Sequence, residues 1–333
     1  MLAVLLTTSV LAMLSAFSGA IGDASLRHSL RTRDAATTAL VVRADVPAEG
    51  RKAAVAALDK GARRTFDGLP LHRESLTRSG PYGLPGAPRG KQPDLTKFAA
   101  IERSEVTLTA GRFPRAPRGS VIEAALPQTA ARQLKLEPGD RLALADRLGG
   151  PAVTVELTGV YRPARPQSPY WTLDELGGRG VQKQSYTTYG PLLADPSVVE
   201  GGRVSDGQSA WLVSADFSTM TTGRIGALRD AARAGTRELL HSKALAGTTA
   251  VGTSLPDVLD RAQRALLVSR STLLIVALQL VLLAGYALLL VARLLSTERA
   301  GETWTLRARG GSRARITSLA AAEALLLALP AAV

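Results

Sequence analysis

The side chains that most often carry out catalysis are few and scattered in this sequence. The three histidines, His28, His72 and His241, lie far apart, and none has the H-E-x-x-H spacing of a zinc hydrolase. We therefore expect them to be surface or hydrogen-bonded histidines rather than metal ligands. The string most like a phosphate-binding loop, residues 86–92, has the wrong spacing and lacks a hydroxyl after its lysine.

Other catalytic arrangements are also missing from the sequence. No G-x-S-x-G motif marks a nucleophilic serine, and the neighbouring carboxylates Asp174 and Glu175 adjoin a glycine-rich segment that predicts a solvated loop. The chain has no cysteine, which excludes disulfide bonds, thiol catalysis and thiolate metal sites. We predict no catalytic, metal-binding or cofactor-binding residue, and a chain that is not itself an enzyme.

A long apolar segment near the end of the chain contains two strongly polar side chains. Residues 273–295 contain only Gln279 and Arg293 as strongly polar groups. At about 1.5 Å per residue they cover roughly 34 Å, slightly more than a ~30 Å hydrocarbon core. We predict a transmembrane helix over residues 271–295. In it, Gln279 can hydrogen-bond a neighbouring helix and Arg293 can extend to the interface.

Arginines follow this helix at high density. Five of them lie within residues 296–315, and the positive-inside rule assigns this segment to the cytoplasm. Glu302, Leu306 and Gly310 recur at helical spacing, the glycine can end a short helix, and Ser312 can cap the next one. The segment predicts an amphipathic helix and a turn at the cytoplasmic surface. A positively charged, well-capped loop beside the membrane is the simpler interpretation of the same residues.

Two more apolar runs lie at the ends of the chain. Residues 1–22 carry no charge and are long enough for a first transmembrane helix, although a cleaved signal peptide without its usual basic start is an alternative. Residues 316–333 predict the start of a third transmembrane helix, so we expect a fragment of a longer protein. Glu323 lies inside this run, where an ionisable side chain is costly and marks a functional candidate unless it reaches the interface.

The remaining residues, 23–270, are expected to form one large body outside the cell. The chain has a formal net charge of +13, yet only 4% of its residues are aromatic and no basic run alternates with aromatic side chains. We therefore predict no nucleic-acid partner. Membrane lipids and cell-envelope anions suit the many arginines better.

Local patterns predict that this body is a mixed α+β domain, with two subdomains as an option. The segments expected to be strands outside its strand-rich part are 37–46, 209–216 and 248–252, and the expected helices are 50–66 and 221–243. A last helix, capped by Thr253 or Ser254 with Pro256 in its first turn, has no break signal before the membrane. Such a helix would couple body and membrane mechanically.

The strand-rich part covers about residues 100–165. Its expected strands are 105–111, 120–126, 140–146 and 153–161, with a helical insert between the second and third and a tight turn at Pro138 and Gly139. Two flanking segments rich in proline predict irregular structure. We expect an exposed loop over 79–93 and a stiff, extended connector over 161–171.

Two segments resemble the FtsX-like permeases, the membrane subunits of ABC systems of the MacB and LolCDE kind. Residues 302–312 read E-T-W-T-L-R-A-R-G-G-S and resemble that family's cytoplasmic E-x-x-x-L-R-A-x-G-x-S segment. Residues 111–163 resemble the strand, small helix, G-D turn and strand pair of its extracytoplasmic domain. The two matches fall in the right order relative to the apolar runs.

The resemblance implies a MacB-like periplasmic core domain flanked by transmembrane helices, and a helix that docks on a cytoplasmic ATP-binding subunit. The residues it implies for ATPase coupling are Glu302, Leu306, Arg307, Gly310 and Ser312. Arg309 departs from the pattern at a place that is usually apolar. The family usually has at least four spanning helices, so this chain would need the remaining permease helices or a second permease subunit.

The expected function is therefore that of a permease subunit of an ABC transporter, located in the cell membrane as a multi-pass protein. It would couple ATP hydrolysis in a separate subunit to movement of the extracytoplasmic domain, which acts on a lipid, peptide or envelope client. The alternative is a membrane-anchored extracytoplasmic sensor or ligand-binding protein without enzymatic activity. In both cases Gln279 and Glu323 are the polar positions expected within the membrane.

Overall fold

The computed structural model describes residues 2–85, 94–298 and 318 of the chain. The chain divides into two compact units, of which unit 2 is Arg27–Asp260 and unit 1 contains the residues on either side of it. Two helices cross the boundary between the units. They are α1, Leu2–Arg31, and α7, Leu255–Glu298.

Helix α1 is longer than the apolar run that begins it. The predicted first span ends at Gly22, but the helix continues to Arg31 because residues 23–31 contain neither proline nor glycine. His28 and Arg31 lie in its last turn, where cationic groups favour a helix C-terminus.

Helix α7 runs without interruption through the predicted second span, 271–295. Among the described residues, one helix is long and apolar enough to cross a membrane, and this is Leu255–Leu294 with a mean hydropathy of 2.6 in its most apolar window. Residues 299–315 of the predicted cytoplasmic segment and, apart from Ser318, the third apolar run lie outside the described residues.

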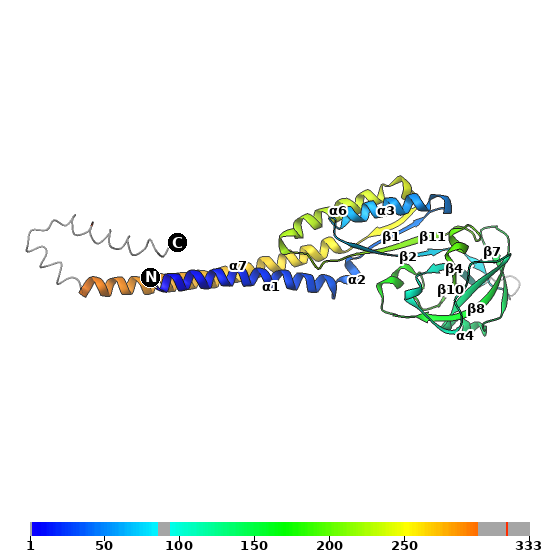
Figure 1. Ribbon diagram of the computed structural model, residues 1–333, viewed down its shortest axis with the longest axis horizontal. Helices are drawn as coiled ribbons and strands as arrows, with labels where there is room; N and C mark the ends of the chain where they lie inside the picture. The colour runs from blue at the N-terminus through cyan, green and yellow to red at the C-terminus, as the bar shows by residue number, and fades with distance from the viewer. Residues whose placement is uncertain (1, 86–93, 299–317, 319–333) are drawn as a thin grey trace, which may run out of the picture. The chain divides into compact units, whose positions relative to one another are not determined.

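Unit 2 is a mixed α+β structure, as the sequence predicts. Its twelve strands in the described residues belong to one sheet. Four of them form an open sheet in the order β12 (Thr248–Gly252), β1 (Leu40–Asp45), β11 (Gln208–Ala215) and β2 (Leu71–Arg78). Helices α3 (Arg51–Thr65) and α6 (Ile225–Leu240) lie side by side over one face of this open sheet (Figure 1).

The open sheet and its two helices enclose a core of alternating side chains. On β1, Leu40, Val42 and Ala44 are buried while the residues between them are partly exposed, which is the pattern of a strand with one covered face. The helices approach each other closely at Gly235, where an added Cβ would lie 2.6 Å from the backbone nitrogen of Thr65. A side chain at this position would therefore push α3 and α6 apart.

The remaining strands close a ring. Its members, in the order in which they pair, are β4 (Leu95–Ile101), β3 (Tyr82–Gly83), β7 (Arg141–Asp146), β8 (Val153–Pro163), β6 (Val121–Pro127) and β10 (Thr187–Ala194), which pairs with β4 again. Strand β4 also pairs with β2 and so joins the ring to the open sheet. Strands β5 (Val106–Gly111) and β9 (Val181–Lys183) pair with β8 and β10 from outside.

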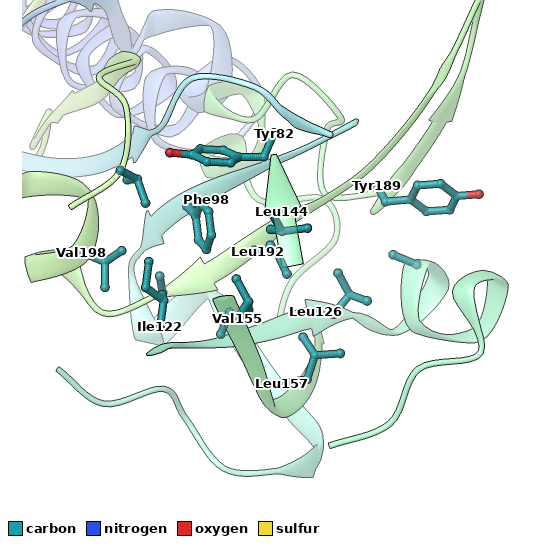
Figure 2. Close-up of a cluster of buried hydrophobic side chains, with 14 of the residues drawn as sticks. Tyr82, Phe98, Ile122, Leu126, Leu144, Val155, Leu157, Tyr189, Leu192 and Val198 are labelled. Atoms are coloured by element: carbon teal, nitrogen blue, oxygen red, sulfur yellow. The ribbon is translucent and has the colours of Figure 1, made fainter. Parts of the chain in front are cut away.

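The inside of the ring is a single apolar core, to which every one of its strands contributes. Figure 2 shows side chains converging from β3, β4, β6, β7, β8 and β10, among them Tyr82, Phe98, Ile122, Leu126, Leu144, Val155, Leu157 and Leu192. The rings of Tyr82 and Phe98 pack edge to face with their centroids 5.2 Å apart. Full burial of one such side chain stabilises the fold by about 1.5–3 kcal/mol.

Short elements complete unit 2. The α-helical ones are α2 (Ala35–Thr38), α4 (Gln128–Leu134) and α5 (Pro196–Glu200). The 3-10 turns are η1 (Ala48–Gly50), η2 (Arg103–Glu105), η3 (Pro169–Leu173), η4 (Thr222–Arg224) and η5 (Lys243–Leu245).

The structure corrects three expectations about this unit. The segment 79–93, expected to be a loop, contains β3, and residues 86–93 of it lie outside the described part. The connector 161–171 is not extended throughout, because Tyr170 and Trp171 lie in η3 and are buried. The helix expected at 221–243 is shorter, since its first residues form η4.

Candidate functional site

The first turns of α7 are built into unit 2. Leu255 and Leu259 are completely buried and Val258 is nearly so, whereas large apolar side chains further along the helix, such as Leu267 and Val268, are more than half exposed. One face of the helix start therefore belongs to the core of unit 2. We call Thr253, Ser254, Leu255, Val258, Leu259 and Asp260, together with their partners in unit 2, the α7 anchor.

Hydrogen bonds fix the point at which α7 begins. The Thr253 hydroxyl accepts a hydrogen bond from the Leu255 amide at 3.1 Å, which confirms the predicted N-cap. The same hydroxyl donates to the Thr38 carbonyl at 2.9 Å, and the Ser254 amide donates to the Thr37 carbonyl at 3.0 Å. The start of α7 is thus tied to the short helix α2.

A carboxylate held by two arginines forms the other side of the α7 anchor. Asp260 lies 3.1 Å from Arg229 Nη1 and 2.8 Å from Arg233 Nη2, and both arginines lie on α6, one turn apart. The hydrogen bonds that Arg229 donates to Asp260 and Asp230 raise its pKa. The Asp260 side chain is about 29% exposed, so the pair is partly shielded from solvent.

The end of α1 and the end of β11 line a small open cavity of about 250 Å³. Leu30 and Phe217 are buried beside it, and Arg31 and Asp216 also contribute to its wall. Asp216 accepts hydrogen bonds from the amide and hydroxyl of Ser218, both at 2.9 Å, and these lower its pKa. The cavity is smaller than a typical small-molecule pocket.

A second charged cluster lies where η3 covers the open sheet. Arg78 is 2% exposed, and its Nη2 donates to Gln208 Oε1 at 2.6 Å and lies 3.4 Å from Glu175 Oε1. Glu175 also pairs with Lys97 at 2.7 Å. Burial alone would raise the pKa of Glu175, but the cations Arg78 and Lys97 lower it overall. The cluster holds the segment that follows η3 onto the sheet.

The expectation that Asp174 is solvated is wrong. Asp174 is 6% exposed, and its carboxylate accepts a hydrogen bond from the Gly178 amide at 2.8 Å. Burial raises its pKa, although that hydrogen bond acts in the opposite direction. The glycines after Asp174 let the chain curl back onto its carboxylate, and this contact is what the sequence pattern conceals. The neighbouring Glu175 is about half exposed.

The described part of the chain contains no grouping suited to metal binding. No three histidine, aspartate or glutamate side chains come together as metal ligands there. His28, His72 and His241 are exposed, as predicted for surface histidines. The described charged clusters hold elements of the fold together.

Some of the residues predicted to be functional lie in the described part of the chain and others do not. Gln279 lies on α7 with an exposed side chain, and Arg293 lies near the end of the same helix. The residues expected to couple to an ATPase, 302–312, and the polar candidate Glu323 lie outside the described residues. Sequence reasoning identified the start and the cap of α7. It missed Asp260 and its arginines, because their contact joins two helices far apart in sequence.

Comparison with known proteins gives a limited result. No family model and no curated protein matches the chain. Among solved structures, it is similar to a domain of a provisionally assigned permease protein from Porphyromonas gingivalis, with 12% identity and a TM-score of 0.29 over 60% of this chain and 85% of the other. It is also similar to the extracellular domain of the noncanonic ABC-type transporter YknZ from Gram-positive bacteria, with 12% identity and a TM-score of 0.28 over 62% and 97% of the two chains.

Proposed function

We propose that this chain is a permease subunit of an ABC transporter of the FtsX-like kind, with unit 2 as its extracytoplasmic domain. In this proposal a separate cytoplasmic subunit hydrolyses ATP, and the chain contributes no catalytic residue. It works together with the remaining permease helices or a second permease subunit, in contact with membrane lipids. Unit 2 acts on a lipid, peptide or envelope client.

The observation that carries the proposal is that α7 is buried in unit 2 at its start and apolar enough to cross a membrane further along. Its first turns are buried in unit 2 and are held by the Thr253 cap and the Asp260 pairs. The same helix then becomes apolar over a length that can cross a membrane. Because the helix is continuous from Leu255 to Glu298, a shift of its apolar part would be delivered to the α7 anchor.

The cytoplasmic end of the proposal rests on residues 302–312. The family-like sequence there places Glu302 and Leu306 on one face of an expected helix, next to a dense group of arginines. Such a face fits a groove on a partner ATPase. The multi-pass arrangement proposed here also places residues 296–315 inside the cell and unit 2 outside.

A pull-down experiment tests the partner. The chain is co-expressed with candidate ATPase subunits, and recovery of the ATPase is compared for wild type, Glu302→Ala, Leu306→Asp and the control Trp304→Ala, which lies on the opposite face at ideal helical spacing. We expect the first two variants to lose the ATPase and the control to retain it. Equal recovery with all four proteins would remove the ATPase-coupling role of this segment.

Labelling of intact cells tests the topology independently of the partner. Single cysteines are placed at Ser185, which is exposed in unit 2, and at Ser312. A membrane-impermeant thiol reagent should modify the first and spare the second. Modification of Ser312→Cys together with protection of Ser185→Cys would invert the proposed arrangement and exclude the permease model. The sensor alternative shares this topology, so the pull-down experiment separates the two.

A further inference from the structure

The loop between β5 and β6 carries an unusual repeat of arginine and proline. Residues 112–118 read R-F-P-R-A-P-R, with an arginine at every third position. The segment forms no helix or strand, and the two prolines favour polyproline II backbone. With three residues per turn and about 3.1 Å per residue, successive arginines of such a backbone lie on one edge, about 9 Å apart.

Burial along the loop follows the same repeat. Arg112, Arg115 and Arg118 are exposed, whereas Pro114 is buried and Pro117 is partly buried. The proline edge therefore faces the body of unit 2 and the arginine edge faces solvent. This arrangement presents the positive charges as a narrow ridge.

Contacts at several points hold the ridge in place. Arg112 forms a bidentate pair with Glu123 at 2.6 and 2.7 Å, and Glu123 also accepts a hydrogen bond from the Arg115 amide at 2.9 Å. Arg203 donates to the Gly119 carbonyl at 2.6 Å, and the Arg103 guanidinium lies 5.5 Å from the centre of the Phe113 ring. The loop is thus fixed before any ligand arrives, which reduces the entropy lost on binding.

Two of the arginines are left available for a ligand. Within the described residues, the guanidinium groups of Arg115 and Arg118 make no hydrogen bond and no ion pair within 4 Å. Among the described residues, Glu123 is the carboxylate that accepts hydrogen bonds from the loop, and it is already engaged by Arg112 and by the Arg115 amide. Glu156 also acts on Arg112 electrostatically. The ridge therefore carries uncompensated positive charge.

We propose that residues 112–118 form a docking ridge for a linear polyanion, whose successive phosphate or carboxylate groups pair with Arg115 and Arg118. Arginine suits this role because its planar guanidinium binds such groups in a bidentate manner. A chain of charges fits a narrow ridge better than a flat lipid surface does. The large apolar side chains that are exposed in the described part of unit 2, Leu148, Tyr186 and Leu240, lie outside this loop, so the ridge lacks a group that would insert into a bilayer.

Inorganic polyphosphate is a suitable probe, because it repeats one anionic group along a flexible chain. Its affinity for the purified full chain in detergent is measured by fluorescence anisotropy for wild type, Arg115→Gln/Arg118→Gln and the control Arg132→Gln/Arg147→Gln. Both pairs of arginines are exposed and both changes remove two charges. We expect binding of the first variant to weaken at least about tenfold, since two charge-assisted contacts are lost. The control should stay within about twofold at moderate salt, because distant exposed charges are screened.

Two results would overturn the proposal. An equal loss of affinity in both double variants would show that net charge alone attracts the polymer. Binding to vesicles that contain an anionic phospholipid, without binding to polyphosphate, would identify a membrane surface as the partner instead. Neither result depends on whether the chain associates with an ATPase.

Discussion

The open sheet and the closed ring of unit 2 share strand β4 but are stabilised differently. Each strand of the ring has paired neighbours that complete the circle, and the core inside it comes from alternating side chains of those strands. The open sheet ends at β12 and depends on α3 and α6, which meet closely at Gly235. The ring thus encloses a core of its own. The open sheet packs against α3 and α6 on one face, and Leu76 and Leu212 share a second core with side chains of the ring strands.

The two candidate functional features lie in different halves of unit 2. The α7 anchor belongs to the open-sheet half, because its partners lie on α2 and α6. The arginine ridge belongs to the ring half, because it joins β5 to β6. If the proposed function and the proposed ridge are both right, movement would enter through the half that holds the α7 anchor, and an outside partner would bind to the other half.

The largest expected effect comes from the strand that the two halves share. Phe98 on β4 is completely buried against Tyr82, so Phe98→Ala should reduce the free energy of unfolding by about 3–5 kcal/mol. Because β4 pairs with both β2 and β10, both halves should unfold in one transition. Denaturant unfolding in detergent, followed by the fluorescence of Trp171 and Trp211, measures this.

A matched change on the surface of the ring half serves as its control. Leu148 is 63% exposed, and Leu148→Ala should alter the free energy of unfolding by less than about 0.5 kcal/mol. If Phe98→Ala produced two separate transitions, the ring and the open sheet would be independent folding units, contrary to the shared role of β4.

The next effect tests the close approach of the two helices. In Gly235→Ala the new methyl group would meet the backbone of Thr65, so α3 and α6 must separate, at a cost of about 1–3 kcal/mol. Gly226→Ala on the same helix meets nothing within 4 Å and should leave stability unchanged or slightly higher. Thermal unfolding of the two variants should therefore shift in different directions. Equal shifts would mean that helix contact does not stabilise the open sheet.

The strands of the ring that sequence reasoning identified are those with a clear local signal. Strands β6, β7 and β8 alternate apolar and polar residues and are separated by recognisable turns, such as the one at Gly139 with its φ of +108°. Strand β10 escaped notice because Gly190 and Pro191 interrupt it, and proline argues against a central strand. The structure accommodates them where the register between β10 and β4 shifts.

In the candidate site, too, local features could be predicted from the sequence and long-range contacts could not. The cap at Thr253 could be predicted because capping is a matter of neighbouring residues. The partners of Asp260 could not, because Arg229 and Arg233 meet it only after α6 and α7 pack together. The burial of Asp174 was likewise invisible, since it depends on how the following glycines fold back.

A smaller effect is the pH dependence of stability that Glu123 of the ring half should produce. Contacts with Arg112 and with the Arg115 amide lower the pKa of Glu123 from 4.5 to about 2. A pKa lower in the folded state means that this stabilisation is present above pH 4.5 and is lost as the pH falls toward 2. Glu123→Gln should therefore lower stability by about 1 kcal/mol at neutral pH and much less near pH 2. Melting temperatures measured across this range test it; an equal difference at both ends would contradict the ion pair.

The smallest expected effect is at the α7 anchor. Asp260→Asn removes two partly exposed ion pairs, each worth only a few tenths of a kcal/mol, while the buried residues Leu255 and Leu259 remain in place. Global stability should change little, but the first turns of α7 should open more often. Amide hydrogen exchange over residues 255–262 would report this as faster exchange than in Asp230→Asn, which removes an exposed pair with Arg229 and keeps Asp260. Unchanged exchange in Asp260→Asn would mean that apolar burial alone holds the start of α7, and that the arginines of α6 contribute nothing to the proposed transmission of movement.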